Sequence, residues 1–265
     1  MDTVSIGKAF TEKRINLSIR GKGGYQGDCI NMNIKNLFGD SLLLFIEAGR
    51  RLDSKDSTEQ DILIVKDVFV SLASNQEKIV DVTGFCCQAH NHAPQEKSVF
   101  LVGALADKRL NELARYLNKA KLGNSPIQSA VWAISDNNEV SSITEDGTEE
   151  VAKLRKFVGK LKNLPADYGW YSIYYKKVKD QLFSGVPEKV TGHFNYMIRD
   201  ISHVFVNIRD AKGTVVKSFE VSNAADRGSY IYDLNWDVSN TPPGVYTVRI
   251  YENGKELKKL PINLK

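Results

Sequence analysis

Apolar and polar residues alternate along the first part of the chain with the two-residue period of half-buried β-strands. Residues 14–20 (RINLSIR) follow this period, and in residues 29–34 the side chains of Ile30, Met32 and Ile34 share one face. Short apolar runs bounded by turn residues continue the series at residues 42–46, 62–65, 68–72 and 79–85. Many short strands at regular spacing favour a sandwich or a barrel over a parallel α/β sheet.

The apolar spacing then becomes helical. Apolar residues recur every three or four positions over residues 107–122, which predicts a helix with Gly123 as its stop. A second helix is expected to open at Ser125-Pro126, because serine caps a helix and proline suits its first position. A third helix is predicted over residues 148–161, with Pro165 ending it.

Strand periodicity returns in the last third. Aromatic residues at 168–175 (YGWYSIYY) indicate a strand, and the stretch 184–187 (SGVP) separates two expected domains, 1–184 and 185–265. Further strands are predicted near residues 190–198, 203–209, 215–221, 229–236, 245–251 and 259–263. The expected fold class is mainly β with a few helices. It combines a β-rich N-terminal domain (a sandwich or barrel with two or three helices) and a C-terminal immunoglobulin-like β-sandwich.

Composition narrows the function classes. The chain has 265 residues, with 36 basic and 32 acidic residues, and its net charge of +4 is too mild and too evenly spread to indicate nucleic-acid binding. No apolar run approaches the roughly 20 residues of a membrane-spanning helix. The N-terminal residues lack a signal-peptide pattern, so the chain is either cytoplasmic or a mature secreted fragment with a new Met1. Three cysteines, an odd number, do not form a disulfide framework by themselves.

The C-terminal third carries recognisable turn and strand motifs. The segments VNIRDAKGTVVKSFEV and YDLNWDVSNTPPGVYTVRIYENGKELKKLPINL resemble the immunoglobulin-like fold of flagellar hook caps. They are equally similar to the C-terminal sorting domains of proteins exported by the type IX system of Bacteroidetes. The resemblance implies a β-sandwich that spaces, exports or assembles. The alternating positions of Trp236 and Tyr246 place both side chains in its core, although a ligand-contacting role is the alternative.

Two short motifs carry candidate chemistry. One is the sequence Phe85-Cys86-Cys87-Gln88 at the end of a predicted strand, and the other is Ile127-Gln128-Ser129-Ala130-Val131-Trp132 at the opening of a predicted helix. Together they resemble the thioester domains of bacterial surface adhesins. The resemblance implies an internal thioester with Cys86 as the thiol and Gln128 as the acyl donor, which an amine on a host surface opens to leave a covalent bond. Cys87 occupies the apolar position and is the alternative thiol.

Other interpretations of these residues stay open at this point. Gln128 sits where a capping box would return a hydrogen bond to Ser125. One of the two adjacent cysteines is expected to be a small buried hydrophobe, because neighbouring strand residues face opposite ways and at most one faces the core. A disulfide from Cys29 to either of them is a further option.

The sequence indicates neither a metal site nor a phosphate-binding loop. Cys86, Cys87, His90 and His92 lie close in sequence, but their spacing matches no standard structural zinc site, and no metal or other cofactor is expected. The glycines of residues 21–27 lead into a strand, whereas a phosphate-binding loop leads into a helix, so we interpret them as a turn.

These features predict a non-catalytic, secreted or cell-surface bacterial protein, either an adhesin or a filament subunit. We expect it to bind a protein or cell-surface ligand and to self-assemble through exposed strands. The alternative is a cysteine-dependent enzyme that uses Cys86 or Cys87 with His90, although neither G-x-S-x-G nor H-E-x-x-H occurs in the sequence.

Overall fold

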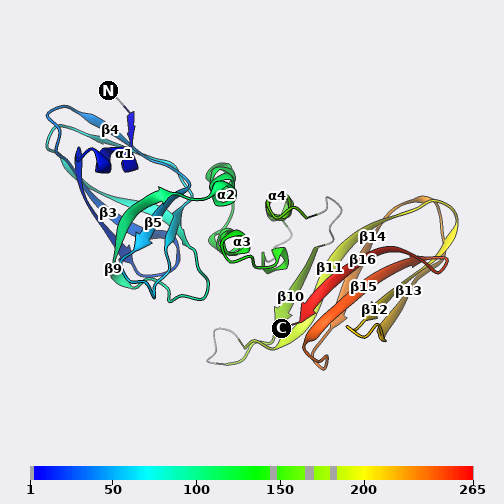
Figure 1. The fold of residues 1–265 in the computed structure, drawn as a ribbon. Coiled ribbons are helices and arrows are strands. Elements are labelled where there is room, and N and C mark those ends of the chain that lie inside the picture. The colour runs from blue at the N-terminus through cyan, green and yellow to red at the C-terminus, as the bar shows by residue number, and fades with distance from the viewer. Residues whose placement is uncertain (1–2, 144–147, 165–169, 180–183, 265) are drawn as a thin grey trace. The chain divides into compact units, whose positions relative to one another are not determined.

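A computed structural model describes residues 3–143, 148–164, 170–179 and 184–264. The chain forms two compact units, Met1–Asn163 and Leu164–Lys265, which we call the N-terminal and C-terminal units (Figure 1). Strands account for 51% of the protein and helices for 19%. The predicted fold class, mainly β with a few helices, is therefore confirmed.

The N-terminal unit is built on a closed six-stranded barrel. Its antiparallel strands follow the order β2 (Ile15–Lys22), β3 (Gln26–Asn36), β8 (Glu77–Cys86), β6 (Ile62–Ile64), β5 (Arg50–Ser54) and β9 (Glu96–Leu105). The alternating apolar residues of these strands fill its interior, where Ile30, Met32 and Leu52 are fully buried. The alternation read from the sequence is therefore the inward face of the barrel.

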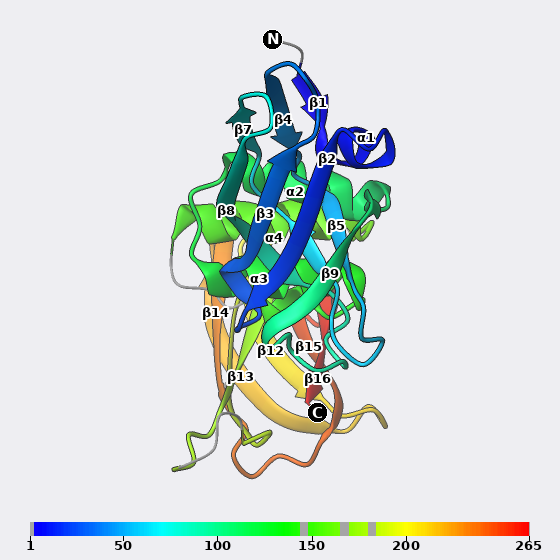
Figure 2. The same cartoon turned by 90° about the vertical axis from the view of Figure 1, so that its left-hand side faces the viewer.

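A small sheet extends the barrel near the N-terminus (Figure 2). β4 (Leu42–Ile46) lies between β1 (Thr3–Ser5), to which it is parallel, and β7 (Val68–Leu72), to which it is antiparallel. The short helix α1 (Ile6–Thr11) follows β1, and Ser5 caps it. The buried leucines and isoleucines of this sheet join the same apolar cluster as the barrel interior.

Helices follow the last barrel strand. They are α2 (Lys108–Lys119), α3 (Asn124–Ser135), the 3₁₀ turn η1 (Val140–Ser142) and α4 (Glu149–Leu161). Asp107 and Thr148 cap α2 and α4, close to the predicted starts. The prediction for Gly123 was wrong, since α2 ends at Lys119 and Gly123 is instead the N-cap of α3. Lys66 accounts for the earlier end, because its ammonium group donates to three carbonyl oxygens at that terminus.

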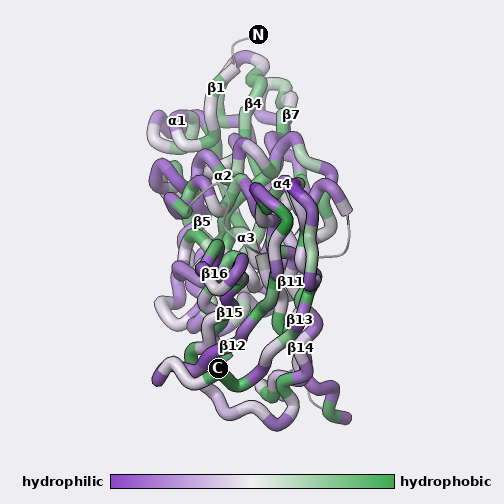
Figure 3. Tube along the Cα trace, turned by 90° about the vertical axis from the view of Figure 1, so that its right-hand side faces the viewer, coloured by the Kyte–Doolittle hydropathy of each residue, from purple (hydrophilic) through white to green (hydrophobic). Residues whose placement is uncertain are grey.

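The C-terminal unit is a β-sandwich. One sheet has the order β10 (Trp170–Tyr175), β11 (Pro187–Ile198) and β14 (Gly228–Asp237). The other has the order β13 (Val215–Ala225), β12 (Ser202–Arg209), β15 (Gly244–Glu252) and β16 (Lys255–Leu264). Figure 3 shows hydrophobic and hydrophilic residues following one another along these strands.

Trp236 and Tyr246 lie inside this sandwich. They are 3% and 5% exposed, and their rings meet edge to face with centroids 5.2 Å apart. The Tyr246 hydroxyl donates to the carbonyl oxygen of Pro242 at 2.8 Å, which satisfies its polar end. The prediction that both side chains belong to the core is confirmed.

The division between the units falls earlier than the expected boundary at residues 184 and 185. β10 pairs with β11 through residues 170–175, so the sandwich already includes a strand that the sequence had assigned to the first domain. The compact units accordingly divide between Asn163 and Leu164. Residues 168–169 of the predicted aromatic strand, and Pro165, lie outside the described residues.

Candidate functional site: the Cys86–Gln128 junction

The two sequence motifs meet in the fold. Gln128 projects from α3, and its carboxamide lies against the backbone of Cys86 at the end of β8. The backbone N–H of Cys86 donates to Oε1 of Gln128 at 3.1 Å, and Nε2 of Gln128 donates to the Cys86 carbonyl oxygen at 2.8 Å. Both residues are buried, with Gln128 only 2% exposed. Residues 42 positions apart in sequence are thereby held side by side.

The carboxamide occupies the place of a neighbouring strand. β3 begins at Gln26, which pairs with Phe85, so β3 offers no strand residue opposite Cys86. The preceding residue, Tyr25, contributes only its carbonyl oxygen, which shares the Cys86 N–H at 3.1 Å. Gln128 supplies a second acceptor for the Cys86 N–H and a donor to the Cys86 carbonyl oxygen, as a ladder partner would.

Gln128 does not cap its helix. α3 begins at Asn124, so Gln128 is its fifth residue, and Gly123 at the N-cap has no side chain to make a capping bond. The capping-box interpretation of Ser125 and Gln128 is therefore wrong. The carboxamide is committed to Cys86 instead.

Both adjacent cysteines are buried, on opposite sides of β8. Cys86 belongs to the apolar cluster inside the barrel, which also contains Cys29. Cys87 lies outside that cluster, where the carboxylates of Asp61, Asp107 and Asp136 act on it. Asp107 is the N-cap of α2, and Asp136 is the C-cap of α3. Only Cys86 therefore faces the core of the barrel, as expected for adjacent residues of a strand, and Cys87 is buried outside that core.

The cysteine thiols are shielded from ionisation. Burial raises the pKa of Cys86 far above its ordinary value, and it raises the pKa of Cys87 to about 12 and that of Cys29 to about 11. All three are free thiols in this structure. A cysteine nucleophile of an enzyme needs a lowered pKa, and His90, its predicted partner, has an exposed side chain.

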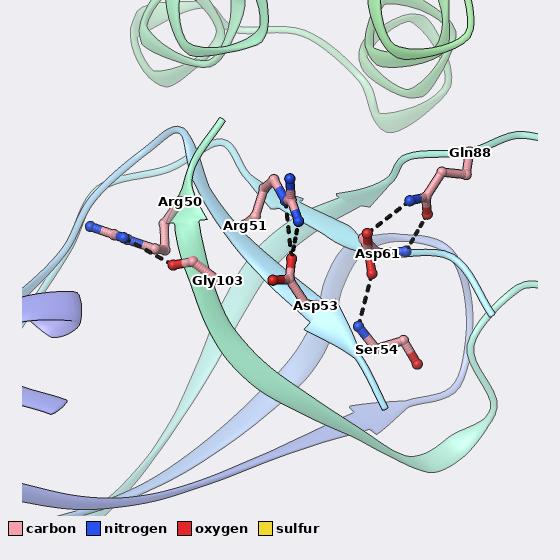
Figure 4. A network of polar contacts seen from close by, with 7 residues as sticks. All are labelled: Arg50, Arg51, Asp53, Ser54, Asp61, Gln88 and Gly103. Atoms are coloured by element: carbon pink, nitrogen blue, oxygen red, sulfur yellow. Dashed lines mark hydrogen bonds and ion pairs between the residues drawn. The ribbon is translucent and has the colours of Figure 1, made fainter. Parts of the chain in front are cut away.

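Hydrogen bonds hold residues 87–89 on both sides, and Figure 4 shows those that join Gln88 to Asp61 and Asp61 to Ser54. The Cys87 N–H donates to the Asp61 carbonyl oxygen at 2.8 Å, and the Ala89 N–H donates to Oδ1 of Asp136 at 2.7 Å. Gln88 lies between them with a left-handed φ of 59°. α3 therefore holds this turn at two points, through Gln128 at Cys86 and through Asp136 at Ala89.

The histidines and the glycine loop play other parts. His90 and His92 are exposed, and the backbone of His92 pairs with Thr58 and Gln60. Within the described ranges, no group of three or more His, Cys, Asp or Glu side chains is arranged to hold a metal ion. The glycine loop leads into β3, and Gly27, with a φ of 79°, packs against Asn124 at the start of α3. It is therefore part of the contact between the barrel and α3.

The two sequence motifs contain Cys86 and Gln128, but not the residues that hold the segment Cys86–Ala89 in place. Asp61, Asp136 and Tyr25 contact Cys86–Ala89 only through the tertiary fold, and no local spacing signals those contacts. Trp132 is the last residue of the second motif, and it follows Gln128 by four positions, so the two side chains share a helix face.

Comparisons with known proteins leave the family open. No family model matches the sequence, and no curated protein matches it. Among solved structures, red sea bream transglutaminase overlaps with a TM-score of 0.25 at 9% identity, covering 95% of this chain and 31% of its own. The CBM51-2 and INT domains of Clostridium perfringens ZmpB overlap with a TM-score of 0.20 at 9% identity, covering 93% and 80%. This chain thus spans under a third of the transglutaminase, and overlaps this slight carry no argument about function.

One further property follows from the helices themselves. In the part of the chain that the structure describes, none of them is both long enough and apolar enough to cross a membrane.

Proposed function

We propose that this chain is a non-catalytic bacterial binding protein that captures an amine-bearing partner through a thioester between Cys86 and Gln128. The observation that supports it is the seating of the Gln128 carboxamide on the Cys86 backbone, with both residues buried. The resemblance of the two motifs to adhesin thioester domains supports the same assignment. Its place of action would be the cell surface or the surrounding medium.

Thioester formation balances without a co-reactant. Sγ of Cys86 attacks Cδ of Gln128, the Cδ–Nε2 bond breaks, and the thiol proton leaves with the amide nitrogen as ammonia. The loss of ammonia from a buried site draws the reaction forward. Because the thiol pKa is raised, the proton stays on sulfur until the step begins, so formation is slow and accompanies maturation of the folded protein.

Burial would then preserve the thioester until a partner arrives. Cys86 is fully buried, which keeps water from the acyl carbon. An amine that reaches this carbon forms an amide with Gln128 and frees the Cys86 thiol. Each molecule can do this once, which is capture and not turnover. The C-terminal sandwich would space or anchor the capturing unit, as the resemblance of its motifs implies.

Intact mass is the decisive measurement. Freshly purified, unreduced protein should be lighter than its sequence by one ammonia, and methylamine should raise the mass by one methylamine. A deficit of two hydrogens that a reductant reverses would mean a disulfide and would contradict the thioester. The full sequence mass in both samples would contradict it equally.

Matched variants locate the bond. Cys86→Ala and Gln128→Ala should each show the full sequence mass and no response to methylamine. Cys87→Ala and Gln88→Ala are the controls, because they change the adjacent thiol and the adjacent carboxamide. Both controls should keep the deficit. A deficit that disappears with Cys87→Ala but survives Cys86→Ala would assign the thiol to Cys87.

Self-assembly is proposed for the C-terminal unit from a separate observation. β13 is an edge strand of 11 residues with exposed Val215 and Val216, and long apolar edges pair readily with other strands. Light scattering should therefore detect association that rises with concentration, and Val216→Lys should suppress it. A persistent monomer at high concentration would contradict this proposal and leave the thioester proposal untouched.

A further inference from the structure

Trp132 lies beside the Cys86–Gln128 junction. It follows Gln128 by one helical turn on α3, so the two side chains share a face of the helix. Its indole packs against the barrel cluster that contains Cys86. The ring of Tyr25 stacks on it, with centroids 6.2 Å apart and planes 12° from parallel. The indole is therefore fixed between the barrel and the Tyr25 turn.

Helix geometry places the indole of Trp132 over the turn that carries Gln128. Side chains in an α-helix point back toward the N-terminus, so a residue covers the turn that precedes its own Cα. For Trp132 that preceding turn carries Gln128. Two residues spaced in this way are neighbours on the helix surface, with Cβ atoms about 5–6 Å apart.

The indole N–H of Trp132 is an unsatisfied hydrogen-bond donor among the residues that the structure describes. Nε1 of Trp132 is buried, and among the described residues it has no hydrogen-bond acceptor. Buried indole N–H groups ordinarily find a partner, because an unsatisfied donor destabilises the fold. In this structure Oε1 of Gln128 takes only the Cys86 N–H. Trp132 thus carries an unused buried donor, and one helical turn before it the Gln128 oxygen has room for another hydrogen bond.

We propose that Nε1–H of Trp132 and the backbone N–H of Cys86 form a two-donor oxyanion hole for the acyl oxygen of Gln128. This inference rests on the proposed thioester and assigns its activating groups. Oε1 of Gln128 becomes the thioester carbonyl oxygen, and the Cys86 N–H already points at it. Trp132 supplies the second donor as charge develops on that oxygen.

The reaction with an amine uses both donors. The amine nitrogen attacks Cδ, and the carbonyl π electrons move onto the oxygen, which becomes an oxyanion. The C–S bond then breaks, its electron pair goes to Sγ of Cys86, and the proton lost by nitrogen goes to that sulfur. The products are an amide at Gln128 and a free thiol. Removing one preorganised donor of this kind typically slows acyl transfer by about 100- to 1,000-fold.

Trp132→Phe tests the donor, because phenylalanine keeps an aromatic ring against Tyr25 but has no N–H. The measured quantity is the rate of methylamine incorporation per molecule that carries the thioester, followed by intact mass. We expect it to fall by about 100-fold while the melting temperature stays near that of the parent. Trp236→Phe removes an indole N–H from the core of the C-terminal unit and should react at the parent rate. A parent-like rate in Trp132→Phe would overturn the inference.

The indole resonance gives a second, independent readout. The chain has three tryptophans, and Trp132→Phe identifies the Trp132 Nε1–H signal in a ¹⁵N–¹H spectrum by its loss. This signal should shift between the parent and Cys86→Ala, which cannot form the thioester. Coincident signals would overturn the inference even if Trp132→Phe fails to mature. A parent protein with the full sequence mass would instead defeat the proposed function itself, so the two failures are distinguishable.

Discussion

Gln88 and Asp61 are joined by two reciprocal hydrogen bonds. The Asp61 N–H donates to Oε1 of Gln88 at 2.8 Å, and Nε2 of Gln88 donates to Oδ2 of Asp61 at 2.8 Å. The other oxygen of Asp61 accepts from the Ser54 N–H at 2.9 Å. This pair ties the turn after Cys86 to the connection between β5 and β6, and it does so while Gln88 holds a left-handed backbone.

Replacing Gln88 should separate the contribution of its two hydrogen bonds to stability from the cost of its left-handed backbone. Gln88→Ala loses the two hydrogen bonds and keeps the unfavourable φ, so we expect the free energy of unfolding to fall by about 1–2 kcal/mol. Gln88→Gly loses the same bonds but relieves the backbone, and should be more stable than Gln88→Ala by about 1 kcal/mol. Urea denaturation of both variants measures the difference. The reverse order of stability would contradict this account.

Gly84 is predicted to tolerate no side chain. An added Cβ would lie 2.3 Å from Cγ2 of Ile62, inside the barrel. Gly84→Ala should therefore lower the free energy of unfolding by about 1–3 kcal/mol or more, as overpacked cores do. Adding Ile62→Ala removes the clashing methyl group, so the double variant should lose less than the sum of the single losses. Gly39→Ala, where nothing lies within 4 Å, is the control, and an equal loss there would refute the steric explanation.

Alkaline pH should weaken the N-terminal unit through its buried thiols. The pKa of Cys87 rises from 9.0 to about 12 on folding, because burial penalises the thiolate. Above pH 9 the unfolded chain loses this proton and the folded chain keeps it. The free energy of unfolding should therefore fall by up to about 1.4 kcal/mol per pH unit for this thiol, and the fall should end once pH exceeds the folded pKa.

Cys87→Ala isolates that contribution. Urea unfolding under reductant at about pH 8 and about pH 10.5 should show a smaller loss of stability in this variant than in the parent. The charged groups that face Cys87 are Asp61, Asp107, Asp136 and Arg51. Equal losses in the parent and the variant would mean that Cys87 titrates alike in both states of the chain.

The boundary between the units makes a prediction about fragments. A fragment of residues 164–265 contains β10 and should fold cooperatively alone. A fragment of residues 185–265 lacks β10, so one edge of β11 loses its pairing and the buried Tyr171 leaves the core. We expect its melting temperature to be lower by several degrees, roughly 4–8 °C for each kcal/mol lost. Equal melting temperatures would favour the boundary predicted from sequence.

The apolar runs were enough to predict many strands. The expected ranges 42–46 and 68–72 coincide with β4 and β7, because continuous apolar residues between turns report a buried strand directly. β5 was missed, since four of its five residues (Arg50–Ser54) are polar and only Leu52 signals an apolar inward face. β9 was missed for a similar reason, as it opens with exposed Glu96 and Lys97. Pairing with their neighbours in the closed barrel, and not an apolar pattern of their own, defines β5 and β9 as strands.

The residues of the candidate site could likewise be predicted only in part from the sequence. Cys86 and Gln128 could be paired from their motifs, since the residue types carry the chemistry. The hydrogen bonds that hold the following turn could not be predicted, because Asp61 and Gln88 are 27 positions apart and Ala89 and Asp136 are 47 positions apart. Only the closed barrel with α3 packed against it brings these groups together. Sequence also assigned Gln128 to a helix cap by local spacing, and the tertiary contact with Cys86 overrode that assignment.

The link from Gln128 to Cys86 also has a mechanical consequence. It closes a loop of chain between positions 86 and 128, which contains β9 and α2. While only hydrogen bonds close this loop, a pull on the two ends of the protein can extend it. Once a covalent bond replaces them, about 150 Å of chain is withheld from stretching, at ~3.5 Å per residue. An anchored molecule would then bear tension through the Cys86–Gln128 bond, and its extension under load would report whether that bond is intact.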